Sequence, residues 1–280
     1  MNNRRDFLVK SSLVTAGLLI SPKIMSQSDK KVKNIGVQLY TFRDAMMKDP
    51  IGTLKKIAAL GIKQIETAGS AKGYYYGLEP SEMKNVCDGL GMTLRSGHVR
   101  LDKHFQKTIE EAVESGQEYV ICSSMPSKGQ TISNYKKVAD AFNKAGEDCN
   151  KMGLKFGYHN HAYEFESHKG EVLYDVLLDN TEASLVHMEL DLGWVIVAGK
   201  DPLDYFKRYS GRFPLWHLKD MDLVKKHSVE LGKGGLDILA MLKNSKESGL
   251  KYLFIEQEEY ANTPFESMTA NMIYLNDLRF

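Results

Sequence analysis

The sequence predicts a single parallel β/α barrel, and three observations support this prediction. Short apolar runs alternate with helix-like stretches along nearly all of the 280 residues, which is typical of parallel strands joined by helices. The alternation gives eight β/α units, and the chain is close to the roughly 250 residues that such barrels use. No glycine-rich dinucleotide fingerprint follows the first strand, which reads GVQLYTFRD, so the rival open doubly wound sheet is disfavoured. We therefore expect a single (β/α)8 TIM barrel over residues 31–280.

Each predicted element follows from hydrophobic patterning and from residues that begin or end helices. Prolines open several helical stretches, and glycines such as Gly91 and Gly153 follow others, as expected of helix caps. The expected strands are 33–40, 62–67, 92–99, 119–123, 154–160, 185–190, 214–218 and 252–256. The expected helices are 50–60, 80–90, 104–116, 133–152, 171–179, 201–209, 236–248 and 264–278.

The first thirty residues predict an export signal rather than part of the barrel. Arg4 and Arg5 are followed by Phe7 and Leu8 and then by an apolar stretch, 13–20, that is too short to span a bilayer. This spacing resembles a twin-arginine signal, although a chance basic start would look similar. We therefore expect residues 1–30 to direct a periplasmic protein that has no stable membrane association once the signal is removed.

Bulk composition excludes several classes of partner. The net charge is +1, so no strong field attracts nucleic acid or an anionic membrane, and we expect no nucleic-acid partner. The three cysteines, Cys87, Cys122 and Cys149, are widely spaced and odd in number. They predict neither a disulfide framework nor a cysteine metal site.

Polar side chains stand where the predicted strands end. In a parallel barrel these ends meet at one mouth, where active sites of this fold lie. Carboxylates and imidazoles gathered in one mouth indicate a divalent-metal site. The residues in these positions are Arg43, Glu66, His98, His159, Asp191, His217 and Glu256.

Three of these positions also have a structural interpretation that the sequence leaves open. Asp191 could cap a helix, His217 could be a core histidine, and Glu256 could belong to a solvated acidic loop with its neighbours. Glu189 could be buried against an Arg or Lys partner. The three tyrosines at 74–76 could form a sugar-stacking wall or pack over the barrel rim.

Five motifs give the chain a specific resemblance. They are LYTFRD at 39–44, YHNHAYEF at 158–165, LDLGW at 190–194, HLKD at 217–220 and IEQE at 255–258. Together they resemble the xylose isomerase-like TIM barrel superfamily, also called sugar phosphate isomerase/epimerase, and its exported branch. The resemblance implies one divalent metal ion (Mn, Co, Mg or Zn) as cofactor.

The resemblance also implies the metal ligands. Asp191, His217 and Glu256 fall on the matching motifs, whereas many relatives have a glutamate where this chain has His159. Either His159 binds the ion or Glu164 turns back into the site. We favour Glu164, because it keeps three carboxylates and one imidazole around the cation.

The implied function is a metal-dependent sugar isomerase or epimerase that removes a proton next to a carbonyl group. His159 and His161 would then transfer protons or hold hydroxyl groups, and Lys219 would neutralise the developing oxyanion. The predicted partner is a small carbohydrate, and a homo-oligomer is left open. The residues expected to bind this substrate are Arg43, Glu66, His98 and Trp194.

Two other functions remain open from the sequence. The same enolate chemistry would serve a 3-keto-glycoside lyase or hydratase, and a sugar-binding barrel without catalysis is the further alternative. Phosphorylated substrates are disfavoured, because export removes the chain from cytoplasmic sugar phosphates and only one loop, GKGG at 232–235, resembles a phosphate cradle. That loop also departs from the acidic GEG-type form that the resemblance implies.

Overall fold

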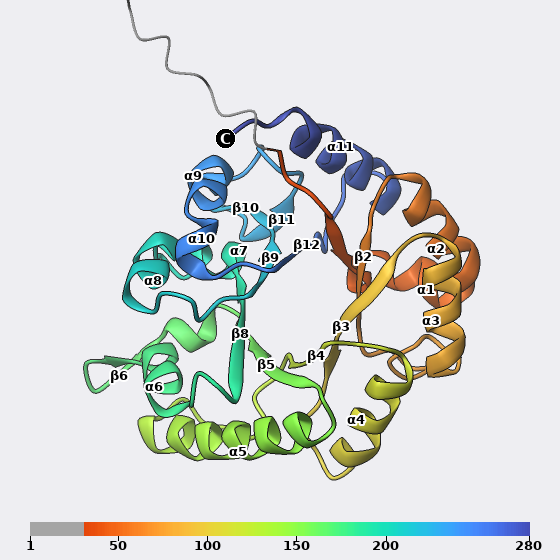
Figure 1. Ribbon diagram of the computed structural model, residues 1–280. Coiled ribbons are helices and arrows are strands. Elements are labelled where there is room, and N and C mark those ends of the chain that lie inside the picture. Colours follow the sequence, from red (N-terminus) through yellow and green to blue (C-terminus); the bar gives the residue numbers. More distant parts are fainter. Residues whose placement is uncertain (1–30) are drawn as a thin grey trace, which may run out of the picture.

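The computed structural model describes residues 31–280 and shows a closed barrel of eight parallel strands ringed by helices (Figure 1). The predicted export signal lies outside the described residues. Around the barrel the strands follow the order β1-β12-β9-β8-β5-β4-β3-β2, and every neighbouring pair is parallel. The predicted fold is therefore confirmed.

The barrel strands match the predicted runs closely. They are β1 (Gly36–Gln38), β2 (Gln64–Thr67), β3 (Thr93–Val99), β4 (Tyr119–Cys122), β5 (Lys155–His159), β8 (Val186–Asp191), β9 (Leu215–Leu218) and β12 (Tyr252–Ile255). The helices around them are α1 (Arg43–Lys48), α2 (Pro50–Ala59), α3 (Pro80–Gly89), α4 (Phe105–Glu114), α5 (Ile132–Lys151), α6 (Leu173–Asn180), α7 (Leu192–Val197), α8 (Pro202–Arg208), α9 (Ile238–Lys243), α10 (Ser245–Ser248) and α11 (Pro264–Asp277).

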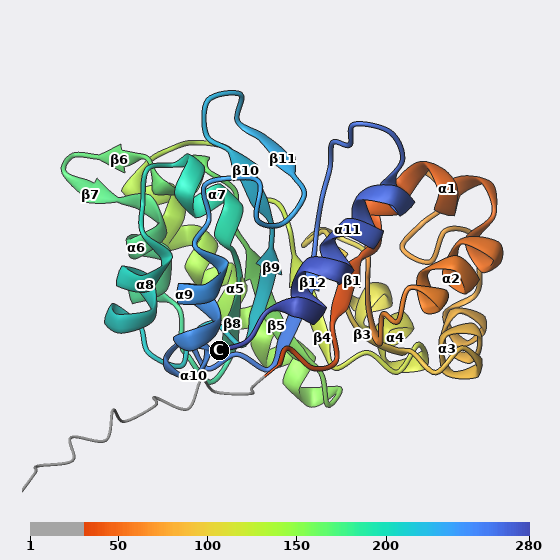
Figure 2. The ribbon, with the colours of Figure 1, turned by 90° about the horizontal axis from the view of Figure 1, so that it is seen from above.

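Several short elements at the mouth were not predicted. Two hairpins, β6–β7 (Ser167–His168 and Glu171–Val172) and β10–β11 (Asp220–Asp222 and His227–Val229), extend beyond the strand ends (Figure 2). The mouth also holds two 3-10 helices, η1 (Leu39–Phe42) and η2 (Tyr163–Phe165). These segments are too short for hydrophobic periodicity to reveal them.

The barrel interior has two levels that differ in polarity. A small apolar cluster of Tyr119, Ile121, Leu215 and Phe254, with Tyr252 against it, closes the amino-terminal end. Above it, polar side chains from the same alternating positions fill the carboxyl-terminal end. A second and larger apolar core lies between the outer faces of the strands and the helices. The polar level is therefore surrounded by packed apolar side chains on all sides except the mouth.

A β-bulge interrupts the pairing of β2 with β3. Ile65 pairs with Leu94, but Glu66 pairs with Ser96, so Arg95 is the extra residue. The Arg95 guanidinium lies over the Tyr252 ring, 5.0 Å from its centroid, in the apolar lower level. Ser96 contacts Glu66 in the polar upper level.

Two remaining observations concern the cysteines and the helices. Cys87, Cys122 and Cys149 are buried free thiols. Among residues 31–280, no helix has the length and apolar character needed to cross a bilayer.

Candidate active site

Six of the seven strand-end residues meet in one buried cluster at the mouth, together with Glu189. Strand alternation places Glu189 and Asp191 on the inner face of β8, and His217 on the inner face of β9. The neighbouring strands contribute Glu66, His98 and His159, and Glu256 follows β12 directly. Arg43 is the seventh residue and is not part of the cluster.

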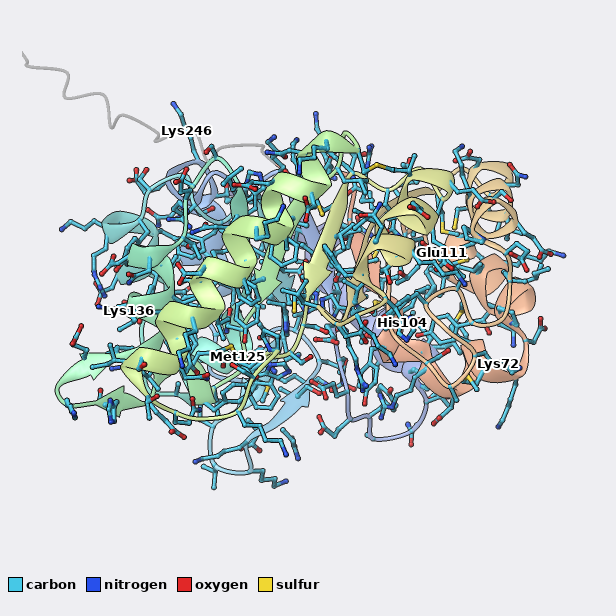
Figure 3. All side chains as sticks on the ribbon, turned by 90° about the horizontal axis from the view of Figure 1, so that it is seen from below. Lys72, His104, Glu111, Met125, Lys136 and Lys246 are labelled. Atoms are coloured by element: carbon cyan, nitrogen blue, oxygen red, sulfur yellow. The ribbon has the colours of Figure 1, made fainter. Side chains whose placement is uncertain are left out.

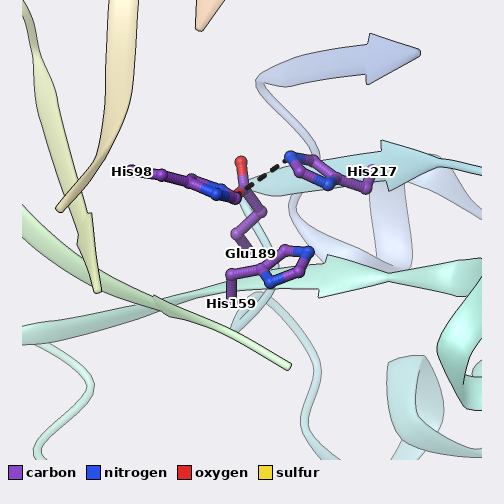
Figure 4. Close-up of side chains that lie close together, drawn as sticks. All are labelled: His98, His159, Glu189 and His217. Carbon is purple, nitrogen blue, oxygen red and sulfur yellow. Dashed lines mark hydrogen bonds and ion pairs between the residues drawn. The ribbon is translucent and has the colours of Figure 1, made fainter. Parts of the chain in front are cut away.

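Two overlapping groups in this cluster bring potential metal-ligand atoms within 4.8 Å of one another. One consists of His159, Asp191, His217 and Glu256, and the other of His98, His159, Glu189 and His217. Figure 4 shows the second group, with Glu189 between the two imidazoles of His98 and His217. The group with Asp191 and Glu256 contains the residues predicted from the motifs, with His159 as the contribution of β5.

His217 is held from both sides of its ring. Its Nδ1 lies 2.9 Å from Glu256 Oε2 and its Nε2 lies 2.6 Å from Glu66 Oε1. Glu66 is itself fixed, because it accepts hydrogen bonds from Gln38 Nε2 (2.8 Å) and Ser96 Oγ (2.6 Å). A carboxylate behind a ligating histidine fixes the tautomer and orientation of the ring.

The pKa values of the Glu66 and Glu189 carboxyls are shifted in opposite directions. Burial opposes the charge of Glu66, but His98 and His217 outweigh this effect and lower the pKa to about 2. Burial, reinforced by the nearby Glu66, raises the pKa of Glu189 well above its usual value. Two adjacent buried carboxylates do not ionise together easily, and Glu189 is the one with the higher pKa.

Lys219 is a buried ammonium group surrounded by carboxylates. Its Nζ lies 2.9 Å from Asp191 Oδ2, 2.7 Å from Glu256 Oε2 and 2.6 Å from Glu258 Oε1. Burial opposes the charge, but the three carboxylates outweigh it and hold the pKa of Lys219 well above its usual value. Lys219 is therefore a fixed positive charge on the wall of the cavity.

The mouth opens into a cavity of about 880 Å³. The cluster contributes His98, His159 and Glu256 to its wall, and His161, Lys219 and Glu258 lie beside them. His161 Nδ1 is buried and has no hydrogen-bond partner among the described residues. Burial, together with the charge of Lys219, lowers the pKa of His161 to about 4, so this imidazole is neutral at pH 7.

Glu164 does not turn back into the site, contrary to the interpretation we favoured from the sequence. Its carboxylate accepts hydrogen bonds from Tyr158 OH (2.5 Å) and from the His161 backbone N–H (2.9 Å), and it belongs to neither ligand group. The 3-10 turn η2 points this side chain behind the loop that follows β5. His159 takes the position at the end of β5 instead.

Three predicted substrate-binding residues also lie off the cavity wall. Glu66 is fully buried behind His217. The Arg43 guanidinium stacks on Tyr40, 4.7 Å from its centroid, and donates to Tyr260 OH and to the Glu258 carbonyl. Trp194 lies behind Lys219, whose Nζ is 5.0 Å from the ring centroid. Of the four residues predicted to bind substrate, only His98 lines the cavity.

Two acids in or beside the cluster, Glu189 and Glu258, were not among the site residues predicted from the sequence. Glu189 lies two residues before Asp191, so strand alternation alone would place it on the inner face. Glu258 lies in an acidic run that resembled a solvated loop, yet its carboxylate contacts Lys219. The alternation signal could have found Glu189, whereas only the folded loop reveals Glu258.

The backbone of the GKGG loop (232–235) and of Leu236 binds the Asp220 side chain. The Asp220 carboxylate accepts hydrogen bonds from the backbone N–H groups of Gly232, Gly234 and Leu236 (2.9 to 3.0 Å). A Cβ atom on Gly234 would come within 2.2 Å of Asp220 Oδ1, so glycine is required there. These N–H groups already have an anionic partner, and this loop therefore offers no phosphate cradle.

The residues of the cluster fit a divalent cation. Asp191, Glu256 and Glu258 surround the Lys219 ammonium, and Glu66 adds a further carboxylate on the other side of His217. His159 Nδ1 and Glu189 Oε1 are buried without a hydrogen-bond partner among the described residues. Mixed carboxylate oxygens and imidazole nitrogens are suitable ligands for Zn, Mn or Co. Unpaired buried donors and excess negative charge are both relieved by a bound cation.

A comparison with known protein families identifies the family of this chain. Residues 54–276 match the sequence profile of the xylose isomerase-like TIM barrel family. The chain belongs to this family. The match includes the motifs at 158–165, 190–194, 217–220 and 255–258, so the xylose isomerase-like relationship suggested by those motifs is confirmed.

Solved structures of xylose isomerase-like barrels resemble this one over almost their whole length. A sugar phosphate isomerase/epimerase from Parabacteroides distasonis ATCC 8503 is 25% identical, with a TM-score of 0.78 over 90% of this chain and 95% of that chain. A structure called IOLI protein, with a bound zinc atom, has a TM-score of 0.66 over 85% of this chain and 95% of that chain. At 15% identity, the second likeness concerns the fold alone.

Curated relatives match over shorter segments. The inosose dehydratase of Geobacillus kaustophilus is 30% identical over 105 residues, which are 36% of this chain and 33% of that protein. The inosose dehydratase of Clostridium beijerinckii is 28% identical over 163 residues, which are 51% of this chain and 54% of that protein. The matches thus span about a third to a half of the length of these relatives.

Proposed function

We propose that this protein is a divalent-metal-dependent sugar isomerase or epimerase. It would remove a proton from the carbon next to a carbonyl group and return it to another position or to the opposite face. The observation that carries this proposal is the convergence of a metal-type ligand group, a fixed ammonium and a neutral imidazole at the inner end of one cavity. The Parabacteroides distasonis sugar phosphate isomerase/epimerase, at 25% identity, supports the reaction class.

His159, Asp191, His217 and Glu256 would hold the ion. When bound, a divalent ion supplies positive charge that stabilises negative charge developing on a substrate oxygen. We choose this group over the one with His98 and Glu189 because it includes two carboxylates, Asp191 and Glu256, that are ionised. Burial opposes their charge, but Lys219 outweighs it and holds both pKa values well below the usual range.

The remaining residues would handle the proton and the hydroxyl groups. His161 is neutral and lines the cavity, so its imidazole can accept a proton from a substrate there. Lys219 cannot accept a proton while it is charged, and it would instead donate hydrogen bonds to a substrate oxygen. His98 lines the cavity and is held by Glu189 at 2.8 Å, which orients its ring toward bound hydroxyl groups.

Elimination is a second candidate, favoured by the inosose dehydratase relatives. The first step is the same proton removal. A carbon–carbon double bond then forms as the carbon–oxygen bond to a leaving group β to the carbonyl breaks, and the leaving oxygen takes a proton. A dehydratase loses water in this step, and a 3-keto-glycoside lyase loses the alcohol of the glycosidic bond.

Proton exchange in deuterated water tests the proposal. The purified protein, supplied with Mn²⁺, Co²⁺, Mg²⁺ or Zn²⁺, is incubated with keto sugars and followed by nuclear magnetic resonance. Deuterium entering the intact sugar, with conversion to an isomer, supports the isomerase or epimerase. Loss of water or an alcohol supports elimination. If no metal supports exchange although sugars still bind, the enzyme proposal is contradicted and the non-catalytic sugar-binding barrel is favoured.

We also propose that the protein works in the periplasm. The support is the twin-arginine pattern at Arg4 and Arg5 followed by the short apolar stretch. Fractionation of cells that express the natural chain and an Arg4→Lys, Arg5→Lys variant tests this. The natural chain should be found in the periplasm and the variant in the cytoplasm, and equal distribution of both would contradict the proposal.

A further inference from the structure

The cavity is larger than one sugar ring requires. A hexose has about 12 non-hydrogen atoms, and even at roughly the 30 Å³ that a whole water molecule occupies in the liquid, which is more than a bonded atom takes, it fills at most about 360 Å³. The cavity measures about 880 Å³. Even with ordered water around the sugar, a space that could hold a second ring is left over.

This extra space lies on one side of the proposed reaction centre. The inner half of the cavity is lined by His98, His159, His161, Lys219, Glu256 and Glu258. The outer half extends over the loops that follow β2, β3 and β4. In Figure 3, Lys72, His104 and Met125 mark these three loops, although only His104 of the three lines the cavity.

The outer half carries side chains suited to a hydroxylated ring. Tyr74 offers an aromatic face, and a sugar ring stacks well on such a face. Arg100 and Asp102 provide a donor and an acceptor, and the hydroxyl groups of Ser123 and Ser124 can act as either. Among the described residues, no side chain pairs with the Arg100 guanidinium, so its five donors are available.

The loops that carry these side chains are tied together. Tyr74 OH accepts a hydrogen bond from the Arg100 backbone N–H (3.1 Å), which joins the β2 loop to the β3 loop. Asp102 Oδ1 accepts one from the His104 backbone N–H (2.8 Å). Ser70 Oγ donates to the Gly73 carbonyl (2.7 Å), which closes the turn that presents Tyr74. Hydrogen bonds therefore hold the β2 and β3 loops in the conformations that present Tyr74, Arg100 and Asp102.

We infer that the outer half is a second sugar subsite and that the substrate is an oxidised disaccharide or a glycoside with a hydroxylated second ring. The inference rests on the proposed function, because that places the keto ring at the inner half. A phosphate group would call for clustered cations, yet here Arg100 stands beside Asp102. An apolar aglycone would leave these polar groups unpaired, which disfavours it.

Binding at a remote ring would contribute to turnover as well as affinity. Contacts to the second ring hold the keto ring in a reactive position, so substrates that lack this ring lose kcat as well as affinity. Each pair of hydrogen bonds lost with the second ring lowers kcat/KM by about tenfold.

The test compares a 3-keto-disaccharide with the methyl glycoside of the matching 3-keto-monosaccharide, using the metal-supplied protein. Proton exchange in deuterated water gives kcat/KM for each. We expect the disaccharide to be preferred by about tenfold or more. Arg100→Ala and Tyr74→Ala, which removes the aromatic face, should lower this preference, whereas Lys103→Ala, on the same loop as Arg100 but off the cavity wall, should not.

Calorimetric titration with the corresponding non-oxidised disaccharide provides a readout that needs no turnover. Its affinity should fall in Arg100→Ala and stay unchanged in Lys103→Ala. Equal kcat/KM for both keto substrates, with variants that match the natural chain, would overturn the subsite while leaving the proposed function intact. If neither keto substrate exchanges its proton with any metal, the proposed function itself fails and the subsite with it.

Discussion

The two halves of the cavity are built in different ways. In the inner half the side chains are buried and hold one another, as Lys219 does with Asp191, Glu256 and Glu258 at 2.6 to 2.9 Å. In the outer half Arg100, Asp102 and His104 are exposed, and the bonds that fix the surface run mainly through the backbone. A rigid, charge-dense half suits one chemical step, and a solvated half can change its specificity without disturbing that step.

Removal of Asp191 should produce the largest effect and shows whether the inner half acts as one unit. Asp191 contacts Lys219 and His159 and caps α7 through the Trp194 backbone N–H. We expect Asp191→Asn to keep the helix cap but to lower metal content and proton-exchange activity by about a hundredfold or more. Elemental analysis and exchange rates measure both. Metal content and activity equal to those of the natural chain would contradict the proposed ligand group.

Glu164 offers a test of the buried support behind the inner half. Burial raises the pKa of its carboxyl to about 7 from the ordinary 4.5, so the folded protein holds a proton that the unfolded chain releases. Stability should therefore fall as pH rises from about 4.5 to about 7, by about 3 kcal/mol from this group. Urea unfolding of Glu164→Gln should lack this part of the pH dependence, and the exposed Glu166→Gln should retain it. An unchanged slope in Glu164→Gln would contradict the raised pKa.

Glu66 separates metal affinity from substrate affinity. It hydrogen-bonds to His217 but does not reach the cavity, so Glu66→Gln should disturb the ring that binds the ion. We expect metal affinity to fall by about 10- to 100-fold while KM at saturating metal changes little. Calorimetric metal titration measures the first quantity, with the exposed Glu79→Gln as control. A changed KM with unchanged metal affinity would restore the substrate-binding role predicted from the sequence.

The smallest effect is expected in the outer half. Asp102→Asn keeps an oxygen that can accept the His104 N–H hydrogen bond but removes the negative charge. We expect kcat/KM for the keto-disaccharide to fall by about two- to fivefold, because exposed charges contribute little. The melting temperature should stay within about 1 °C, since surface substitutions have small effects on stability. A fall of a hundredfold would mean that the two halves are not separable.

The sequence predicted those parts of the site that follow from strand periodicity. His98, His159, Asp191, His217 and Glu256 stand at strand ends, and parallel closure brings such ends together whatever the loops do. Glu164 was interpreted wrongly because it lies in a turn, where the direction of a side chain depends on a hydrogen bond to Tyr158 that no periodicity encodes. Arg43 was misplaced for the same reason, because it begins α1, and η1 separates it from the end of β1.

The tyrosines at 74–76 show how both interpretations of one motif can hold. Tyr75 and Tyr76 are buried and pack beneath the rim, as the structural interpretation predicts. Tyr74 lines the cavity, as the sugar-stacking interpretation requires. The sequence alone could not show which of the three tyrosines is buried and which lines the cavity. The loop backbone, in which Tyr76 has a φ of 57°, determines the side to which each ring points.

The extra residue in β3 also limits how this barrel can change over evolution. The bulge lets one strand direct Arg95 to the apolar floor and Ser96 and His98 to the site. Deletion of a single residue here would reverse every later side chain of the strand, turning His98 outward and Gly97 inward. A change of length in a loop at the mouth leaves the inward and outward alternation of the strands unchanged. The number of residues in β3 between Leu94 and Ser96, by contrast, should stay fixed in every descendant that keeps this active site.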